Sequence, residues 1–296
     1  MKTSPTHVLK FGGSSLQTTD LIRQAAELVS ARTNNTRPVV VVSAIDGVTD
    51  QLIALADGNF ENTDSPPPQI TQLKQQHLEY FDTLISADHP NRPLLNDLFT
   101  ELEAITKDQI FRKNNRYAWR DQLLSIGERA SALIFASLLS HWDIPAHARE
   151  AQHFIKTDSS FGRAQVDLDT TRNLIQQAVS SADGIPVITG FIGSNDDKQI
   201  TTLGRSGSDY TAGLVASALD AERLEIWTDV NGVLTADPKW VPGAESIQQL
   251  SFADISELSA HGANVIHPQT IRPLQNTDTA VVVKNSHNPV HPGTLI

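Results

Sequence analysis

Thr201-Thr-Leu-Gly-Arg-Ser-Gly-Ser-Asp-Tyr210 is a glycine-punctuated turn that follows a predicted strand and leads directly into the apolar run 211–219. Such a turn points backbone N–H groups and a helix N-terminus at one place, which suits an anion. It also brings Arg205 and Asp209 close together, and a guanidinium pairs well with a carboxylate or phosphate. We expect this stretch to form the centre of an active site, although an ordinary strand-to-helix connection could carry the same glycines.

Strands and helices alternate on both sides of this turn. Near the N-terminus, Val8-Leu-Lys-Phe11 is a short strand broken by Gly12-Gly13, and Pro38–Ser43 is a continuous β-branched run. A run without polar alternation is typical of a strand buried on both faces of a parallel sheet. Further strands are predicted at 185–190 and 223–229, and a closing strand at 279–284. The sequence therefore predicts an α/β fold with a mostly parallel sheet and helices on both faces.

Helical periodicity is clearest in the first half of the chain. Two apolar stripes, over 70–85 and 94–105, predict a helical insertion. They are followed by a long helix over 119–142 that contains Gly127 next to Glu128. A glycine inside a helix costs ~1 kcal/mol relative to alanine. We therefore expect Gly127 to allow the close approach of another group.

The composition excludes several classes of function. The chain has 296 residues, a formal charge of −11 and no cysteine. The charge and the lack of a Lys/Arg cluster argue against a nucleic-acid partner, but not against a small anionic ligand. Without cysteine there is no disulfide framework and no thiolate metal site. No signal peptide and no apolar run approaching ~20 residues is present, so we expect a soluble, cytoplasmic protein with no membrane partner.

Polar residues gather where the predicted strands end. These groups are Lys10–Ser15, Ser43–Thr49, Gly204–Asp209 and Thr228-Asp229. In open parallel sheets, ligands bind beyond the carboxyl ends of the strands. A lysine, glycine turns, hydroxyls, an arginine and carboxylates are the groups that phosphoryl transfer needs for positioning and charge neutralisation. Neither a G-x-x-x-x-G-K-[ST] loop nor a G-x-G-x-x-G after the first strand is present, which disfavours P-loop and dinucleotide sites.

Five signatures in order along the chain resemble those of aspartate kinases, within the amino acid kinase family. They are Lys10–Ser15, Leu203–Tyr210, Trp227–Val233, His261–Pro268 and Asn288–Ile296. The Gly-Glu pair in Ser125–Arg129 also falls where these enzymes carry one on a helix. The resemblance implies one α/β/α sandwich, a single catalytic domain over 1–296. Aspartate would bind over the N-terminal part, with its insertion at about 69–118, and ATP over the C-terminal part at about 185–296.

The resemblance also implies an activity, the ATP-dependent phosphorylation of the β-carboxylate of L-aspartate to 4-phospho-L-aspartate. This reaction is the first step towards lysine, threonine and methionine. ATP and Mg²⁺ would be required, with the ion held mainly by the nucleotide phosphates, and the enzyme would be a cytoplasmic homodimer. Aspartate kinases usually continue into paired regulatory ACT domains, which this sequence lacks. If the chain is complete, we expect no feedback inhibition by lysine or threonine through such domains.

The resemblance assigns roles to individual residues. Lys10 would reach the transferred phosphoryl group and Asp209 would orient Lys10, because a carboxylate nucleophile is already ionised at neutral pH and needs no base. Arg205 would pair with the α-carboxylate of aspartate and Glu128 with its α-ammonium group. Ser43, Thr49 and Ser208 would complete the substrate pocket. The nucleotide would be contacted by Lys10, Gly12, Gly13, Ser14, Thr228, Asp229, Leu234, Lys239 and Asn264, and no protein ligand to a metal is expected.

Two departures from the family pattern keep alternatives open. Asn264 stands where many relatives have a lysine near the phosphates, and Leu234 stands where an aromatic residue often packs near the adenine. A catalytically silent or regulatory kinase-like subunit therefore remains an alternative. Another is a family member that acts on glutamate, N-acetylglutamate, carbamate or UMP. The pairing of Glu128 with Arg205 favours a zwitterionic amino acid, because its two charged ends need both an anion and a cation.

Overall fold

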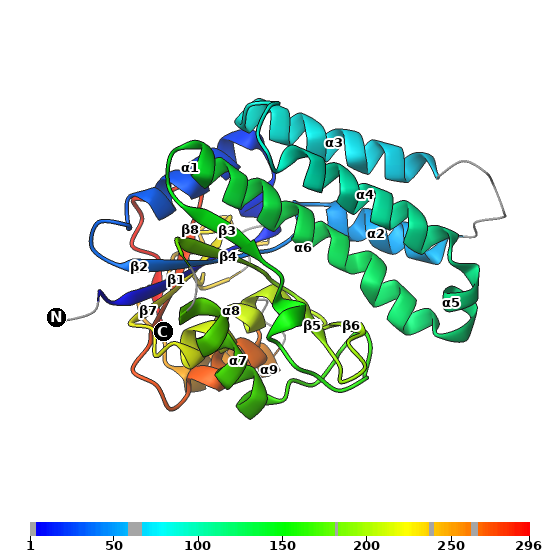
Figure 1. Cartoon of the computed structure of the whole chain (residues 1–296). Helices are drawn as coiled ribbons and strands as arrows, with labels where there is room; N and C mark the ends of the chain where they lie inside the picture. Colours follow the sequence, from blue (N-terminus) through cyan, green and yellow to red (C-terminus); the bar gives the residue numbers. More distant parts are fainter. Residues whose placement is uncertain (1–3, 59–66, 181–182, 237–239, 262–265) are drawn as a thin grey trace.

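A computed structural model describes residues 4–58, 67–180, 183–236, 240–261 and 266–296. Within them, seven strands form one sheet in the order β3-β4-β2-β1-β7-β8-β9, shown in Figure 1. All neighbouring strands run parallel except β8 and β9. The strands are β1 (Thr6–Phe11), β2 (Arg37–Val42), β3 (Ala146–Arg149), β4 (Ile185–Thr189), β7 (Arg223–Thr228), β8 (Ala280–Asn285) and β9 (Thr294–Leu295).

Successive residues of the central strands enter two different apolar cores. Val8 of β1 and Val39 of β2 join one core, whereas their neighbours Leu9 and Val40 join the other. Because both faces are buried, these strands show no polar alternation in the sequence. The predicted α/β fold, with a mostly parallel sheet between two helical layers, is confirmed.

The two cores are covered by different helices, on opposite sides of the sheet in Figure 1. One layer contains α1 (Thr19–Ser30), α2 (Val48–Asp57), α3 (Pro68–Leu84), α4 (Arg92–Lys107), α5 (Gln109–Asn114) and α6 (Arg116–His141). The other contains α7 (Leu168–Ser180), α8 (Gly207–Ala218), α9 (Phe252–Ala260) and α10 (Pro268–Ile271). The 3-10 segments are η1 (Gly13–Leu16), η2 (Ala151–His153) and η3 (Arg272–Leu274). An antiparallel hairpin of β5 (Ile192–Ser194) and β6 (Ile200–Thr202) stands apart from the main sheet.

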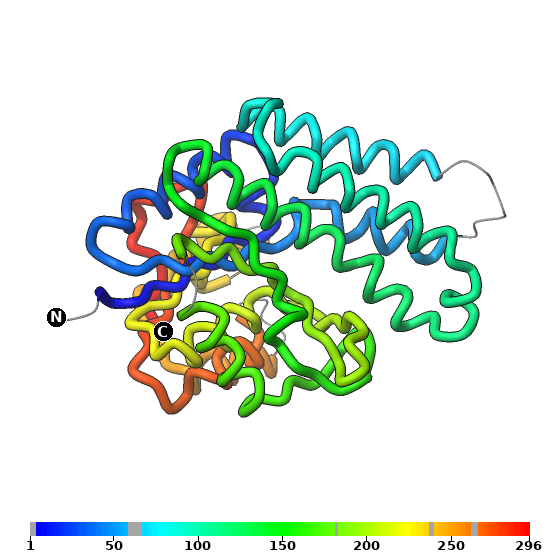
Figure 2. Tube along the Cα trace, viewed as in Figure 1, coloured from blue at the N-terminus to red at the C-terminus, as the bar shows by residue number. Residues whose placement is uncertain are grey.

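Helix α6 packs against β2, β3, β4, β6 and the five other helices of its layer. Figure 2 shows how its trace runs past the sheet towards the outer end of α4. By length and composition α6 is the one helix among the described residues that could span a bilayer. However, 89% of its apolar 18-residue stretch is buried inside the protein. A core helix of a globular protein passes the same test, and Glu128 and Arg129 interrupt its apolar run.

Local sequence chemistry sets several element boundaries. The Ser251 side chain caps α9 and the Asp254 side chain accepts from the Ser251 amide, which forms a capping box. Helix α10 begins at Pro268, because proline lacks only an amide that is unpaired at this position.

Two strands differ from the sequence-based expectation. The predicted closing strand at 279–284 is β8, but the short antiparallel strand β9 follows it and pairs with Val282 and Val283. Strand β3 was not predicted at all. Its sequence, Ala-His-Ala-Arg, has little intrinsic strand preference, and its conformation depends on pairing with β4.

Candidate active site

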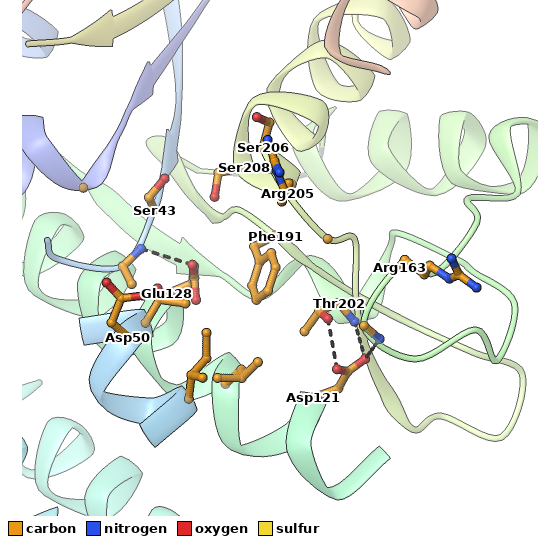
Figure 3. A pocket seen from close by; sticks show the side chains of 18 of the residues that line it. Ser43, Asp50, Asp121, Glu128, Arg163, Phe191, Thr202, Arg205, Ser206 and Ser208 are labelled. Carbon is orange, nitrogen blue, oxygen red and sulfur yellow. Dashed lines mark hydrogen bonds between the residues drawn. The ribbon is translucent and has the colours of Figure 1, made fainter. Parts of the chain in front are cut away.

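A cavity of about 690 Å³ lies beyond the carboxyl ends of β1 and β2, beside the turn that opens α8. Adjacent parallel strands end at the same edge, and this is where ligands bind in such sheets. Figure 3 shows Ser43 and Glu128 facing this pocket together with Arg205 and Ser208, which come from the turn at the start of α8. The predicted residues that line the cavity are Lys10, Gly13, Ser43, Thr49, Glu128, Arg205, Ser208 and Asp209.

Lys10 forms the cationic centre of the cavity. It is a buried residue of β1, and its Nζ lies 2.5 Å from Oδ1 of Asp209, in the first turn of α8. A Cβ atom on Gly12 would lie 3.2 Å from the same Nζ, so the missing side chain at Gly12 leaves room for the Lys10 ammonium group. The predicted pairing of Lys10 with Asp209 is therefore present in the structure.

The turn after β1, which is expected to contact the nucleotide, has one amide that is already paired. The Gly12 amide donates to the carbonyl oxygen of Trp227 at 3.2 Å, so it is already engaged in joining β1 to β7. The next two amides belong to Gly13 and Ser14, which open η1. The first N–H groups of a helix have no partner within the helix itself. These two amides are better placed than that of Gly12 to receive phosphate oxygens.

The turn before α8 has an unusual backbone. Gly204 has φ of 80° and Ser206 has φ of 55°, so the residues on both sides of Arg205 are left-handed. The Gly207 amide closes the turn by donating to the Gly204 carbonyl at 3.0 Å. Arg205 is exposed at the cavity wall and has no hydrogen bond or ion pair with any described residue. Its guanidinium group is available to an anionic ligand.

Glu128 lies on α6 and is only 3% exposed. One carboxylate oxygen accepts from the Ala44 amide at 3.2 Å, while Oε2 has no partner among the described residues. Burial raises the pKa of Glu128 to about 8, and the hydrogen bond from Ala44 opposes this shift. Gly127 allows the arrangement, because a Cβ there would lie 2.8 Å from the Ala44 Cβ. The close approach predicted from this glycine is confirmed.

Ser43 and Thr49 reach the cavity from the segment that follows β2. Ser43 continues the strand, with its amide donating to the Phe11 carbonyl at 3.0 Å. Thr49 lies in the first turn of α2, and both residues are half-buried. Ser208 reaches the cavity from the start of α8. It packs closely against Gly190, because a Cβ on Gly190 would lie 2.5 Å from the Ser208 Cβ. Hydroxyl groups thus enter the cavity from two different chain segments.

The predicted nucleotide residues are less well assembled. Thr228 ends β7 next to the end of β1, and its hydroxyl donates to Asp229 at 3.0 Å. Leu234 is half-buried and forms an isolated antiparallel β-bridge with Ser246. Gly12, Ser14, Thr228, Asp229 and Leu234 do not line the cavity. Lys239 and Asn264 fall outside the described residues.

Phe191 and Asp121 also line the cavity, and neither was predicted from the sequence as a site residue. Phe191 follows β4 with φ of 68° and projects into the pocket (Figure 3). Asp121 lies seven residues before Glu128 on α6, which is about two helical turns, so both carboxylates share one face of the helix. That spacing is the sequence signal that could have identified Asp121.

Asp121 is 1% exposed and fully hydrogen-bonded. Its carboxylate accepts from the Gly162 amide at 2.8 Å, from the Thr202 amide at 2.7 Å and from the Thr202 hydroxyl at 3.0 Å. Burial raises the pKa of Asp121, and the three donors act against that shift. The side chain joins α6 to the hairpin that precedes the Arg205 turn.

Comparison with known proteins gives relatives that match nearly the whole chain. Lysine-sensitive aspartokinase 3 of Escherichia coli (strain K12) is 35% identical over 293 residues, which cover 98% of this chain and 63% of the relative. Aspartokinase 2, chloroplastic, of Arabidopsis thaliana is 34% identical, with 98% of this chain and 54% of the relative covered. The chain therefore spans less than two thirds of the length of these two relatives.

A solved structure agrees with these matches. The crystal structure of E. coli aspartokinase III in complex with aspartate and ADP superimposes with a TM-score of 0.85 at 34% identity, covering 98% of this chain and 64% of that one. The family model described as the amino acid kinase family matches residues 5–285. From this match and from the architecture of the sheet and cavity, we conclude that the chain belongs to the amino acid kinase family.

Proposed function

We propose that this chain catalyses the ATP-dependent phosphorylation of the β-carboxylate of L-aspartate, which gives 4-phospho-L-aspartate and ADP. One observation carries the proposal. A single cavity contains the Lys10–Asp209 ion pair, Oε2 of Glu128 and the guanidinium group of Arg205, and the last two groups have no partner among the described residues. The similarity to aspartokinases, one of them solved with aspartate and ADP, supports the choice of substrates.

Substrate recognition follows from the two opposite charges. The α-ammonium group of aspartate would donate to Oε2 of Glu128, which has no partner among the described residues. Its α-carboxylate would pair with Arg205, whose planar group suits bidentate binding. The hydroxyl groups of Ser43, Thr49 and Ser208 would accept or donate the remaining hydrogen bonds.

The chemistry requires positioning rather than proton transfer. An oxygen of the ionised β-carboxylate attacks the γ-phosphorus of ATP, and the bond from that phosphorus to the ADP oxygen breaks. The Lys10 ammonium group neutralises charge on the phosphoryl oxygens, and Asp209 holds the ammonium group in place. Because the nucleophile is already ionised at neutral pH, neither residue has to act as a base.

We propose that the nucleotide lies over the C-terminal part of the chain, at about 185–296, and that aspartate lies over the N-terminal part with its insertion at about 69–118. Residues 1–296 would then act as one catalytic domain. Mg²⁺ would be held by the nucleotide phosphates and water, its preferred ligands. The described residues contain no cluster of three or more His, Cys, Asp or Glu side chains that could hold it instead. We further propose that the protein works in the cytoplasm as a homodimer.

A substrate panel tests the proposal. The purified chain is supplied with ATP and Mg²⁺ and with aspartate, glutamate or N-acetylglutamate, while ADP release and acyl phosphate formation are measured together. We expect turnover with aspartate and at least about tenfold lower kcat/KM for the other two. Acyl phosphate trapped as its hydroxamate distinguishes the reaction from ATP hydrolysis.

Lys10→Met serves as the control for contaminating kinases, because it keeps the length of the side chain and removes the charge. Its rate should fall to background while aspartate still binds. Preference for glutamate or N-acetylglutamate would assign the chain to another reaction of the same family. Nucleotide binding without any turnover would instead support a silent, regulatory subunit.

A further inference from the structure

We infer that Asp121 is a positioning residue that fixes Arg205 relative to Glu128 and thereby sets the length of the amino acid that the site accepts. The inference rests on the proposed function, because it assigns Glu128 and Arg205 to the two α groups of the substrate. It adds a residue that touches neither group and acts through the backbone before Arg205. Three structural observations support it.

The first observation is the number of backbone groups that Asp121 holds. It binds the Gly162 amide and both the amide and the hydroxyl of Thr202, all within 3.0 Å (Figure 3). These donors belong to two different segments, the loop at 161–163 and the last residue of β6. One buried carboxylate therefore fastens two separate segments to helix α6.

The second observation is where those segments lead. Thr202 is followed by Leu203, Gly204 and Arg205. The Gly162 carbonyl oxygen would lie 3.2 Å from a Cβ on Gly204, so this loop packs against the turn itself. The Ala164 amide also donates to the Thr202 carbonyl at 2.9 Å, which joins the two segments to each other. Both segments bound by Asp121 thus border the residue before Arg205.

The third observation concerns the side chain of Arg205 itself. Its side chain has no hydrogen bond or ion pair with any described residue, so its location depends on the backbone of the turn. Glu128, by contrast, projects from the same buried helix as Asp121, about two turns away. Asp121 therefore ties the segments that border the Arg205 turn to the helix that carries Glu128.

This link has a consequence for selectivity. Glu128 and Arg205 would grip the ammonium and carboxylate groups on one carbon atom, and this two-point contact fixes the direction of the substrate side chain. The β-carboxylate of aspartate then reaches the phosphoryl group, whereas the carboxylate of glutamate lies one methylene further along. A looser Arg205 would let the longer substrate adjust. Small geometric errors of this kind weaken reaction rates strongly.

Asp121→Ala tests the inference, and Asp121→Asn is the conservative rescue. An asparagine oxygen can accept from both amides, and its NH₂ group can donate to the Thr202 hydroxyl. We expect Asp121→Ala to raise KM for aspartate at least about 30-fold and to reduce the aspartate-to-glutamate ratio of kcat/KM at least about tenfold. KM for ATP should stay within about twofold. Asp121→Asn should keep both aspartate parameters within about fivefold.

Thr202→Val covers the case in which Asp121→Ala does not fold, because it removes only one of the three donors. We expect it to shift KM and selectivity in the same direction by about three- to tenfold. Thr279→Val is the matched control, since it removes a buried hydroxyl hydrogen bond of 2.7 Å to Ala221, away from the cavity. It should lower the melting temperature without changing KM for aspartate.

Aspartate binding measured by calorimetry without ATP separates this inference from the proposed activity. If the wild-type chain binds aspartate but transfers no phosphate, the proposed function fails and the affinities of the variants still test Asp121. Wild-type affinity and selectivity in folded Asp121→Ala or Thr202→Val would overturn the inference. An equal loss of kcat for both amino acids at unchanged KM would also overturn it, because a purely structural role predicts that pattern.

Discussion

Asp121 and Glu128 lie two turns apart on α6 and are buried to nearly the same extent, at 1% and 3% exposure. Asp121 accepts three hydrogen bonds, whereas Glu128 accepts one from Ala44 and leaves an oxygen unpaired among the described residues. Burial raises the pKa of both groups. Equal burial with unequal pairing separates a carboxylate whose partners all lie in the protein from one with an oxygen left open to a ligand.

The difference is energetic as well as geometric. A buried carboxylate is stable when donors surround it, and leaving it unpaired favours its protonated form. Glu128 is therefore a poor choice for stability alone. A positively charged ligand would supply the missing partner and favour the ionised form again. Substitutions around Glu128 and around Asp121 are therefore expected to have different effects.

The largest effect is expected from Glu128→Gln. The amide has nearly the same shape but cannot offer a negative charge to the α-ammonium group, and truncating one partner of a buried charge pair costs about 2–5 kcal/mol. We expect kcat/KM for aspartate to fall by about 10³-fold, equivalent to about 4 kcal/mol. Steady-state kinetics with saturating ATP measure this loss.

Glu27→Gln is the matched control for this change, because Glu27 lies exposed on α1 and does not line the cavity. Its kcat/KM should equal that of the wild-type chain. If Glu128→Gln also keeps full activity, the unpaired oxygen has no role in substrate binding, and the contrast with Asp121 is only structural.

A second prediction concerns the pH dependence of stability without ligand. The pKa of Glu128 rises from 4.5 to about 8 on folding, so the folded chain binds more protons than the unfolded chain between these values. The stabilisation is fully present below pH 4.5 and is lost as pH rises through about 8. Between pH 6 and pH 9, Glu128→Gln should gain about 2–3 kcal/mol of unfolding free energy relative to wild type.

Urea unfolding at several pH values measures this gain, and Asp121 remains in both proteins so that its own titration cancels. Saturating aspartate should raise the melting temperature of the wild-type chain but not that of Glu128→Gln. A constant stability difference from pH 6 to pH 9 would show that Glu128 keeps an ordinary pKa and is better paired than the structure indicates.

The features that could be predicted from the sequence are those with a local pattern. The strand ends near Phe11 and Thr228 were predictable because mainly apolar segments stop there and glycines or polar residues follow. Parallel strands end at one edge, so the gathering of Lys10, Asp209 and Ser43 followed from the fold class alone. Gly127 was informative because glycine is unfavourable inside a helix.

Other features depended on contacts between distant segments. Asp121 looks like one more charged residue on a helix until the hairpin at 192–202 is folded against it. The engagement of the Gly12 amide by Trp227 depends on the register between β1 and β7. The seven-residue spacing places Asp121 on the same helix face as Glu128, but it does not reveal the partners of Asp121. Those partners, like the partner of the Gly12 amide, are fixed by tertiary pairing between residues far apart in the chain.

The smallest effect is expected from Gly127→Ala, which tests how the Glu128 turn of α6 is built. The added Cβ would lie 2.8 Å from the Ala44 Cβ and 3.3 Å from a methyl group of Val48, so the segment after β2 has to move. Alanine is favoured over glycine in a helix by about 1 kcal/mol, but overpacking costs about 1–3 kcal/mol. We expect a net loss of about 1 kcal/mol in urea unfolding.

The same shift should weaken aspartate binding, because Ala44 carries the amide that holds one Glu128 oxygen. We expect KM for aspartate to rise about threefold, with KM for ATP unchanged. Gly243→Ala is the control, since no atom lies within 4 Å of its added Cβ. A Gly127→Ala chain that is more stable and binds aspartate normally would mean that α2 can withdraw without disturbing Glu128. The Glu128 carboxylate would then be placed by α6 alone, whereas that of Asp121 is also held by Gly162 and Thr202.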